Sequence, residues 1–307
     1  MKSVVLFPGQ GAQYPGMGHS VYNGSEAAKN IFRCASDIAG ESIEALCFDS
    51  TKEELSRTIH SQIAIFTCSL AVLAALKEQG VQPSAFAGFS LGEYTALTAS
   101  GIVSLEDGFR LVHKRGELMQ QAADSLDGCM AAVLGLEDSI VEEICASTNG
   151  IVLPVNYNCP GQLVIAGERN AVQKAADKCR EAGARRVMPL AVSGAFHTPL
   201  MADAAAQLRE FASSISFHTP EIPVYTNVTG TLLSVDDMPA HLEQHMVSPV
   251  RWNTLAQTML ADGLTHAIEA GPGKTLTGFA RRISKELSCT AVESMESVLT
   301  ASKGGAE

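Results

Sequence analysis

The segment Phe86-Ala-Gly-Phe-Ser-Leu-Gly-Glu-Tyr94 places Ser90 between two glycines. Residues 83–87 predict a short buried strand before the serine, and residues 91–99 predict a helix after it that ends before Gly101. A turn this tight between a strand and a helix needs small neighbours, which glycine supplies. The pattern therefore predicts a serine hydroxyl that stands above the end of a sheet.

The surroundings of this turn matter, because a G-x-S-x-G pattern also arises by chance in a chain of 307 residues with 26 glycines. The helix predicted before the turn, residues 62–79, is apolar almost all round, which is typical of a helix packed inside an α/β layered fold. The Leu91 N–H lies at the start of the following helix, at the positive end of its dipole. We expect this N–H to be able to stabilise an oxyanion beside Ser90.

The composition limits the class of protein. With 46% hydrophobic and 18% charged residues, the chain can bury a large core and is long enough for two domains. Its net charge of -11 argues against general nucleic-acid binding, which needs an excess of Lys and Arg. The eight cysteines include no C-x-x-C pair, so we expect reduced thiols and neither a metal site nor a disulfide framework. The N-terminal apolar run is too short for a signal peptide, and no stretch approaches a membrane span, so we expect a soluble cytoplasmic protein.

Two glycine-rich loops look like nucleotide-binding loops but do not match them in detail. In the loop 8–18, the third glycine of a dinucleotide-binding motif would fall on Tyr14. In the loop that contains Gly273-Lys274-Thr275, the first glycine of a phosphate-binding motif would fall on Ile268. Nucleotide binding is therefore not predicted. The first loop is either a surface turn or a source of backbone donors such as the Gln10 N–H.

Arg115 falls among the inward-facing positions of a predicted helix. Ser104 is the predicted N-cap of this helix, which runs to about Ala122. Arg115 lies four residues after Leu111 and four before Met119, on its apolar side. A buried guanidinium needs a carboxylate partner to offset the cost of desolvation. The spacing leaves open whether that carboxylate belongs to a ligand or to the protein, or whether the side chain reaches the surface.

The domain organisation follows from a change of pattern between residues 127 and 191, where strands and helices alternate in the order β-α-β-β-α-β. The strands are predicted at 130–134, 151–155, 162–166 and 186–191, and the helices at 137–146 and 171–182. We expect 127–191 to be a small inserted domain, 1–126 and 192–307 to form the large domain, and a cleft to lie at their junction. Residues from about 289 to 307 are small and polar, and we expect them to fray.

His197 is the candidate general base. It lies just ahead of a predicted helix, because Thr198 is a good N-cap and Pro199 a good first helical residue. The helix dipole there disfavours the imidazolium form and helps to keep the ring neutral, as a base must be. A histidine at a helix start can also be only a structural hydrogen-bonding residue.

Six segments occur in a characteristic order. They are Phe7-Pro-Gly-Gln-Gly-Ala-Gln13, Gly88-Phe-Ser-Leu-Gly-Glu-Tyr94, Arg115-Gly-Glu-Leu-Met-Gln120, Asn158-Cys-Pro-Gly-Gln-Leu-Val-Ile-Ala-Gly167, Gly194-Ala-Phe-His197 and Glu269-Ala-Gly-Pro-Gly-Lys274. Together they span nearly the whole chain and resemble the motifs of the malonyl-CoA:acyl carrier protein transacylase family. The resemblance implies an α/β-hydrolase-like large domain with a parallel sheet and a small ferredoxin-like (βαββαβ) inserted domain, in agreement with the order of elements above.

The resemblance also implies a reaction and its catalytic groups. An acyltransferase of this family moves a malonyl group from coenzyme A to the phosphopantetheine thiol of acyl carrier protein by a ping-pong mechanism, here through a malonyl-Ser90 ester with His197 as the base. The backbone N–H groups of Gln10 and Leu91 would form the oxyanion hole. The backbone carbonyl of His245 would orient His197 in place of an acid.

Three side chains receive substrate-binding roles from the resemblance. Arg115 would pair with the free malonyl carboxylate, Gln62 would help to fix the pocket, and Phe196 would favour malonyl over methylmalonyl groups by leaving little room at the α-carbon. Two positions depart from the family, since Phe89 stands where histidine is commonest and Ile63 replaces the usual proline.

The implied partners are malonyl-CoA and holo acyl carrier protein, with no cofactor, metal, nucleic acid or membrane, and we expect a monomer. A basic patch of Lys274, Arg281, Arg282 and Lys285 is either a docking site for an acidic carrier protein or a set of ordinary solvated charges.

Two alternative functions stay open. The first is an acyl-thioester hydrolase of the same fold acting on carrier-protein-bound acyl groups, against which Arg115 weighs. The second is a non-catalytic scaffold, against which the Ser90 and His197 pair weighs. The sequence does not distinguish fatty-acid from polyketide synthesis.

Overall fold

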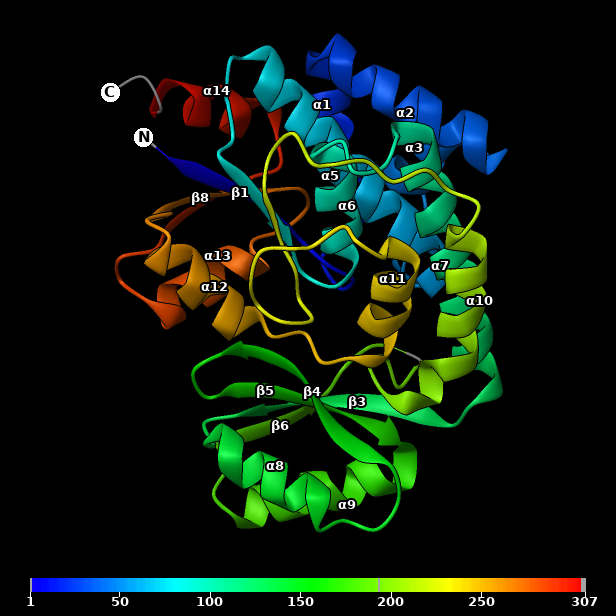
Figure 1. The fold of residues 1–307 in the computed structure, drawn as a ribbon, viewed down its shortest axis with the longest axis vertical. Coiled ribbons are helices and arrows are strands. Elements are labelled where there is room, and N and C mark those ends of the chain that lie inside the picture. The colour runs from blue at the N-terminus through cyan, green and yellow to red at the C-terminus, as the bar shows by residue number, and fades with distance from the viewer. Residues whose placement is uncertain (1, 193, 305–307) are drawn as a thin grey trace.

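The computed structural model describes residues 2–192 and 194–304, and within them the strands form two separate sheets (Figure 1). The strands are β1 (Ser3–Phe7), β2 (Ala85–Gly88), β3 (Gly128–Leu134), β4 (Val152–Cys159), β5 (Gln162–Glu168), β6 (Arg186–Pro189), β7 (Val224–Tyr225), β8 (His266–Ala270) and β9 (Ser288–Val292). One sheet is parallel with the order β7-β2-β1-β8-β9, and the other is antiparallel with the order β4-β5-β3-β6. The protein therefore has a mixed α/β fold.

Helices surround both sheets. They are α1 (His19–Gly24), α2 (Glu26–Ala39), α3 (Ile43–Phe48), α4 (Lys52–Leu55), α5 (Thr58–Glu78), α6 (Leu91–Ala99), α7 (Leu105–Ser125), α8 (Asp138–Ala146), α9 (Arg169–Glu181), the 3-10 turn η1 (Pro199–Met201), α10 (Ala202–Ala212), α11 (Met238–Val247), α12 (Trp252–Ala261), α13 (Thr275–Ile283) and α14 (Met295–Gly304).

The parallel sheet is buried on both faces, as sheets of this kind usually are. In β1, Val5 and Phe7 point into the apolar cluster that contains α5, α6 and α7, whereas Val4 and Leu6 point into the cluster that contains α12 and α13. This alternation follows from the two-residue period of a strand. In Figure 1 the sheet accordingly lies between α5 and α6 on one side and α12 and α13 on the other.

Helix α5 is the most apolar of the large elements. It has 21 residues, with a mean hydropathy of 1.8 over an 18-residue window, and is long and apolar enough to cross a membrane by length and composition alone. The expectation that no stretch approaches a membrane span is wrong for this helix. However, 83% of its most apolar window is buried inside the protein, as expected for a central helix that packs on every side.

The antiparallel sheet follows the predicted order of elements, β3-α8-β4-β5-α9-β6. Strand β4 is longer than predicted and continues to Cys159. In β3, Ala131 and Val133 face the cluster that α8 and α9 cover, while Met130 and Ala132 join the main core. The second face of this sheet thus packs on the rest of the protein.

The predicted fraying near the C-terminus is wrong for the described residues up to 304. Strand β9 pairs in parallel with β8, and α14 follows it. Val292 and Val298 are both fully buried and join the main core. These two contacts could not be predicted from the polar composition of the segment, because it is ordered by pairing with the distant strand β8. Residues 305–307 lie outside the described structure.

Candidate active site

Ser90 lies in the turn between β2 and α6, with φ 51° and ψ −104°. A positive φ is unusual for a residue other than glycine and stores backbone strain. A Cβ atom on Gly88 would lie 1.9 Å from the carbonyl carbon of Gly92, and one on Gly92 would lie 2.1 Å from the carbonyl oxygen of Phe7. Both glycines are therefore required by close backbone approach. Helix α6 begins at Leu91, as predicted.

The Ser90 hydroxyl and the His197 ring lie within hydrogen-bond distance, with 2.8 Å between Oγ and Nε2. Nδ1 of the same ring lies 3.0 Å from the Ser248 carbonyl oxygen and 3.2 Å from that of His245. Because carbonyl oxygens only accept, Nδ1 carries the ring proton and donates it, which leaves Nε2 to accept from the serine. The His245 carbonyl lies where the sequence analysis expected an orienting group. The Ser248 carbonyl was not predicted, because it comes from a segment 51 residues away and no sequence motif marks it.

The His197 ring is neutral mainly because it is buried, a cause that the sequence did not indicate. Burial, with the positive charge of Arg115 as the next cause, lowers the pKa of His197 to about 4. The segment after it starts as the single 3-10 turn η1, in which Thr198 Oγ1 accepts a hydrogen bond from the Leu200 N–H at 3.3 Å, before α10 begins. Thr198 is the N-cap and Pro199 the first helical residue, as predicted, and the first turn is a 3-10 turn.

Arg115 is 1% exposed and faces the serine. Its Nη1 donates to Gln62 Oε1 at 2.7 Å, and its Nη2 donates to Ser90 Oγ at 3.2 Å. The centre of the guanidinium group lies 4.9 Å from the centroid of the Tyr94 ring. Among the residues that the structure describes, no carboxylate lies within 4.0 Å of it. The internal salt bridge that the sequence left open is absent there, and a buried cation stands beside the nucleophile without an anionic partner.

The loop after β1 lies beside the serine turn. Phe7 pairs with Gly88, and a Cβ atom on Gly9 would lie 2.4 Å from the Phe89 carbonyl oxygen. This register brings Gln10 toward the turn, and the Gln10 side chain donates to Thr58 Oγ1 at 3.3 Å. Within the described part of the chain, neither the Gln10 nor the Leu91 backbone N–H has a hydrogen-bond acceptor. Both can donate to a ligand.

The two phenylalanines beside the dyad are held in different ways. Phe196 is 5% exposed, and its ring lies against Gly194, where a Cβ atom would come within 2.4 Å of it. Phe89, at the position that departs from the family, packs against Trp252 and Phe279 with ring centroids 5.6 Å and 6.0 Å apart. An aromatic ring at this position extends the apolar cluster under α12 and α13.

Two polar residues that contact the turn were not predicted from the sequence. Asn227, in the loop after β7, contacts the backbone of Ser90 and Gly88, and Glu93, in the first turn of α6, contacts Asn227. A polar residue after the carboxyl end of a strand was the available signal, since such ends meet at one edge of a parallel sheet.

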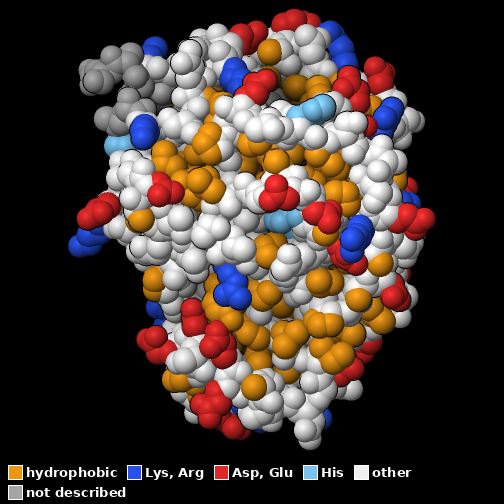
Figure 2. All heavy atoms as spheres, in the orientation of Figure 1, with side chains coloured by type: hydrophobic (Ala, Val, Ile, Leu, Met, Phe, Trp, Pro, Cys, Tyr) orange, Lys and Arg blue, Asp and Glu red, His pale blue; other side chains and the backbone are white. Residues whose placement is uncertain are grey.

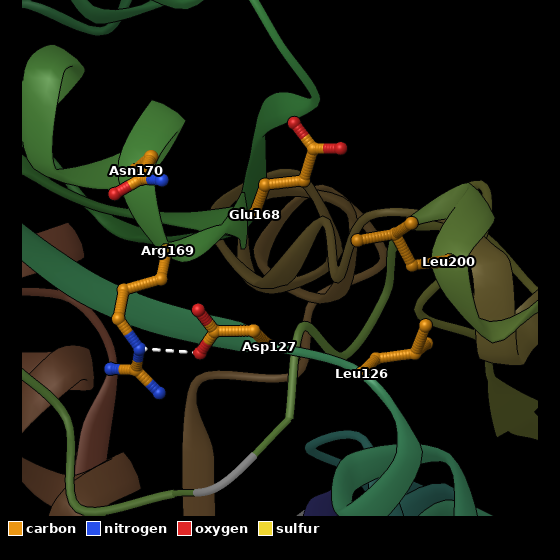
Figure 3. Close-up of a pocket in the computed structure, with 6 residues that line it drawn as sticks. All are labelled: Leu126, Asp127, Glu168, Arg169, Asn170 and Leu200. Carbon is orange, nitrogen blue, oxygen red and sulfur yellow. Dashed lines mark hydrogen bonds and ion pairs between the residues drawn. The ribbon is translucent and has the colours of Figure 1, made fainter.

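A pocket of about 380 Å³ lies where the chain passes from α7 into β3. The domain boundary that the sequence places at residue 127, with its cleft, stays a prediction. Figure 3 shows it with Asp127 and Arg169, whose carboxylate oxygen and guanidinium nitrogen lie 2.6 Å apart, on one side and Leu200 on the other. Leu200 follows His197 by three residues, so the pocket borders the segment that carries the base. Figure 2 draws the face of the molecule seen in Figure 1, with hydrophobic side chains gathered across its middle and acidic side chains mostly at its edges.

No group of three or more His, Cys, Asp or Glu side chains suited to a metal ion occurs among the described residues. All eight cysteines carry free thiols.

Comparisons with known proteins identify the family. Residues 4–303 match the family described as the acyl transferase domain. The chain is 38% identical over 301 residues to the malonyl CoA-acyl carrier protein transacylase of Bacillus subtilis, covering 97% of this chain and 95% of the relative. An acyl carrier protein S-malonyltransferase structure from Vibrio cholerae superposes with a TM-score of 0.94 at 39% identity, covering 98% of this chain and 100% of the other. A malonyl-transacylase solved in complex with its type II polyketide synthase acyl carrier protein superposes with a TM-score of 0.96 at 37% identity, covering 99% of this chain and 100% of the other. The chain therefore belongs to the acyl transferase domain family and, within it, to the malonyl CoA-acyl carrier protein transacylases.

Proposed function

We propose that this protein transfers a malonyl group from malonyl-CoA to the phosphopantetheine thiol of holo acyl carrier protein, through a malonyl ester on Ser90. The observation that carries the proposal is the buried Arg115 guanidinium, which has no carboxylate within 4.0 Å among the described residues and donates to the hydroxyl that also meets His197. A site built in this way suits an acyl group with a negative charge at its far end.

In the first half-reaction, Nε2 of His197 takes the proton from Ser90 as Oγ attacks the thioester carbonyl. The Leu91 and Gln10 N–H groups donate to the oxyanion that forms. When this intermediate collapses, the carbon–sulfur bond breaks and the coenzyme A sulfur takes the proton from Nε2. The ester on Ser90 remains.

In the second half-reaction, the phosphopantetheine thiol gives its proton to Nε2 of His197 and attacks the ester carbonyl. Ser90 leaves with that proton, and the malonyl group is now a thioester on the carrier protein. In both halves the two carbonyls of His245 and Ser248 accept from Nδ1 and stabilise the transient imidazolium ion.

The experiment that tests the proposal is intact-protein mass spectrometry after mixing with malonyl-CoA, and again after adding holo acyl carrier protein. A malonyl adduct that moves to the carrier protein is the expected result. An adduct that is lost to water at the same rate with or without the carrier would make the protein a hydrolase. No adduct at all would contradict the proposed activity.

Replacing Arg115 with Ala is expected to lower kcat/KM for malonyl-CoA by about 10²–10⁴-fold, since losing one member of a buried ion pair costs about 3–5 kcal/mol. Loading from acetyl-CoA should not fall, because acetyl has no carboxylate to pair. Arg115→Lys is the matched control, which keeps the charge but not the two parallel donors, and should lie between Ala and the unchanged protein. Equal losses for malonyl-CoA and acetyl-CoA would contradict the role of Arg115 in recognition.

Replacing Phe196 with Ser is expected to raise the ratio of methylmalonyl to malonyl loading by about 10-fold or more, because one methyl group is discriminated by about 1–3 kcal/mol in an apolar site. Competition between the two coenzyme A esters, read by mass spectrometry, measures the ratio. Phe196→Leu retains more of the volume and should change it less. An unchanged ratio in Phe196→Ser would show that another group limits the space at the α-carbon.

Carrier-protein docking is proposed at the exposed basic residues of α13 and its flanks. Arg282 is held by Gln162 Oε1 at 2.8 Å and by the Pro160 carbonyl at 3.2 Å, so the double variant Arg281→Glu with Lys285→Glu tests the patch without breaking that link. We expect KM for the carrier protein to rise severalfold at low salt while loading from malonyl-CoA stays unchanged. The pair of changes Lys174→Glu with Arg180→Glu on α9 is the charge-matched control. If both double variants raise KM equally, net charge and not this patch is responsible.

We further propose the finer architecture that the order of elements supports. Residues 1–126 and 192–307 form an α/β-hydrolase-like large domain, and 127–191 form a ferredoxin-like inserted domain, whose βαββαβ order and strand order β4-β5-β3-β6 support the assignment. A monomer in the cytoplasm that needs no cofactor is proposed with them, and the free thiols support a reducing compartment.

A further inference from the structure

We propose that Glu93 and Asn227 are positioning residues, through which one buried carboxylate holds both the serine turn and the carbonyl that orients His197. The inference rests on the proposed function only for its malonyl readout. Neither side chain reaches the substrate in the mechanism above, so both act through the dyad.

Asn227 clamps the strained turn at both ends. Its Oδ1 accepts from the Ser90 N–H at 2.6 Å, and its Nδ2 donates to the Gly88 carbonyl at 2.7 Å. The Ser90 N–H and the Gly88 carbonyl lie on either side of the turn. Both make their hydrogen bonds to the Asn227 side chain and not to a strand or helix backbone. Since Ser90 has a φ of 51°, these two hydrogen bonds stabilise a backbone conformation that is unfavourable for serine.

The Glu93 carboxylate binds the backbone of Asn227. The Glu93 side chain is 1% exposed, and its Oε2 accepts from the Asn227 backbone N–H at 2.6 Å. Its Oε1 accepts from Thr226 Oγ1 at 3.0 Å and lies 2.7 Å from Nε2 of His241. Burial alone would raise the pKa of Glu93, but the adjacent His245 and His241 rings and the Asn227 N–H lower it to about 2. The carboxylate is therefore charged at neutral pH, and a charged acceptor makes the stronger hydrogen bonds.

The same carboxylate reaches the second member of the dyad through α11. His241 and His245 lie one turn apart on this helix, and Nε2 of His245 lies 3.6 Å from Glu93 Oε2. The backbone carbonyl of His245 is one of the two acceptors for Nδ1 of His197. Glu93 thus anchors the helix whose C-terminal end orients the base, while Asn227 fixes the nucleophile.

The test compares Asn227→Ala, Asn227→Asp and Glu93→Gln with the unchanged protein. Asn227→Asp keeps an acceptor for the Ser90 N–H but sets an oxygen against the Gly88 carbonyl. The rate of Ser90 malonylation in a single turnover is measured by intact mass, and thermal unfolding is followed by circular dichroism. We expect each variant to fold and to acylate about 10²-fold more slowly at saturating malonyl-CoA, because a displacement of about 1 Å has this effect on a reacting group.

Two further readouts separate positioning from a general loss of stability. The first is the pH dependence of acylation. The charged and titratable groups that face His197 are Arg115 from α7, Glu93 from α6 and the His245 ring from α11, whose centroid lies 5.7 Å from that of His197. The Glu93 charge raises the pKa of His197. Removing that charge in Glu93→Gln should move the acid limb of the rate profile to lower pH. The second is the rate at which phenylmethanesulfonyl fluoride labels Ser90, which should fall in the same variants without involving malonyl-CoA.

Glu269→Gln is the matched control. Glu269 is also fully buried, and its oxygens accept from the Leu276 and Thr277 N–H groups at 2.9 Å and 2.7 Å, at the start of α13. It should lose thermal stability and keep its acylation rate. Where Glu93→Gln does not fold, Thr226→Val removes one hydrogen bond to the same carboxylate and should give a smaller slowing.

Folded variants that react at the unchanged rate would overturn the inference, as would an equal slowing in Glu269→Gln. The proposed function fails separately, if the unchanged protein forms no malonyl adduct. The sulfonyl fluoride rates still decide the positioning roles in that case.

Discussion

Ser90→Ala is expected to abolish the malonyl adduct and to lower malonyl transfer by about 10⁶-fold, the loss typical of removing a serine nucleophile. The reason is geometric. The Ser90 hydroxyl lies 2.8 Å from the basic nitrogen of His197 and 3.2 Å from the Arg115 guanidinium, so the base and the cation proposed to bind the malonyl carboxylate both contact one oxygen. The measurement is intact mass after malonyl-CoA, together with transfer to holo acyl carrier protein.

Ser100→Ala is the control for this variant. Ser100 is buried, at 1% exposed, and its hydroxyl donates to the Leu97 carbonyl at 3.0 Å, at the end of the same helix that Ser90 precedes. It should keep both the adduct and the transfer. An adduct that persists in Ser90→Ala would assign the nucleophile to another residue and contradict the mechanism.

The second large effect concerns His197 and pH. Replacing His197 with Ala is expected to slow acylation by about 10²–10⁴-fold, the usual contribution of a general base. Burial and the Arg115 charge lower the pKa of His197 to about 4, from an ordinary value of 6.5. The base works only when its ring is neutral, so activity should be level above about pH 5 and fall as the pH drops through about 4.

The same shift affects stability. The unfolded chain binds the His197 proton more tightly than the folded protein does. The contribution of His197 to the free energy of unfolding is therefore fully present above pH 6.5 and is lost as the pH falls to about 4. The acid limb of acylation should therefore be measured in short assays, with folding checked at each pH. An acid limb near 6.5 would mean that the ring is open to water. His218→Gln, a change at an exposed histidine, should leave the profile unchanged.

Short-range features were predictable because their causes lie within a few residues of one another. Helix α6 follows the glycine-flanked turn at Leu91, the Ser104 hydroxyl accepts from the Asp107 N–H at 3.1 Å, and β5 begins at Gln162 as its apolar run predicts. In each case the period of apolar residues, a capping side chain or the conformational freedom of glycine acts locally.

Errors arose where a distant contact outweighs local composition. The segment after residue 288 reads as a fraying tail, yet β9 gains order from its pairing with β8. The sequence indicated only the contribution of a helix dipole to the neutrality of His197, because burial, the main cause, depends on distant packing.

The candidate site shows the same division. Ser90, His197 and Arg115 could be named from motifs, since their residue types and flanking patterns carry the chemistry. Their distances could not, because these three side chains come from a turn, a loop and a helix that meet only after the parallel sheet has formed. Asn227 lies 137 residues after Ser90 and carries no motif of its own. Its role depends on the pairing of β7 with β2, which brings the Asn227 side-chain amide into contact with the Ser90 N–H and the Gly88 carbonyl. Local residue patterns thus determine the elements and the kinds of reactive group in this protein. Long-range packing determines which of those groups meet, how deeply they are buried and, through burial, their protonation.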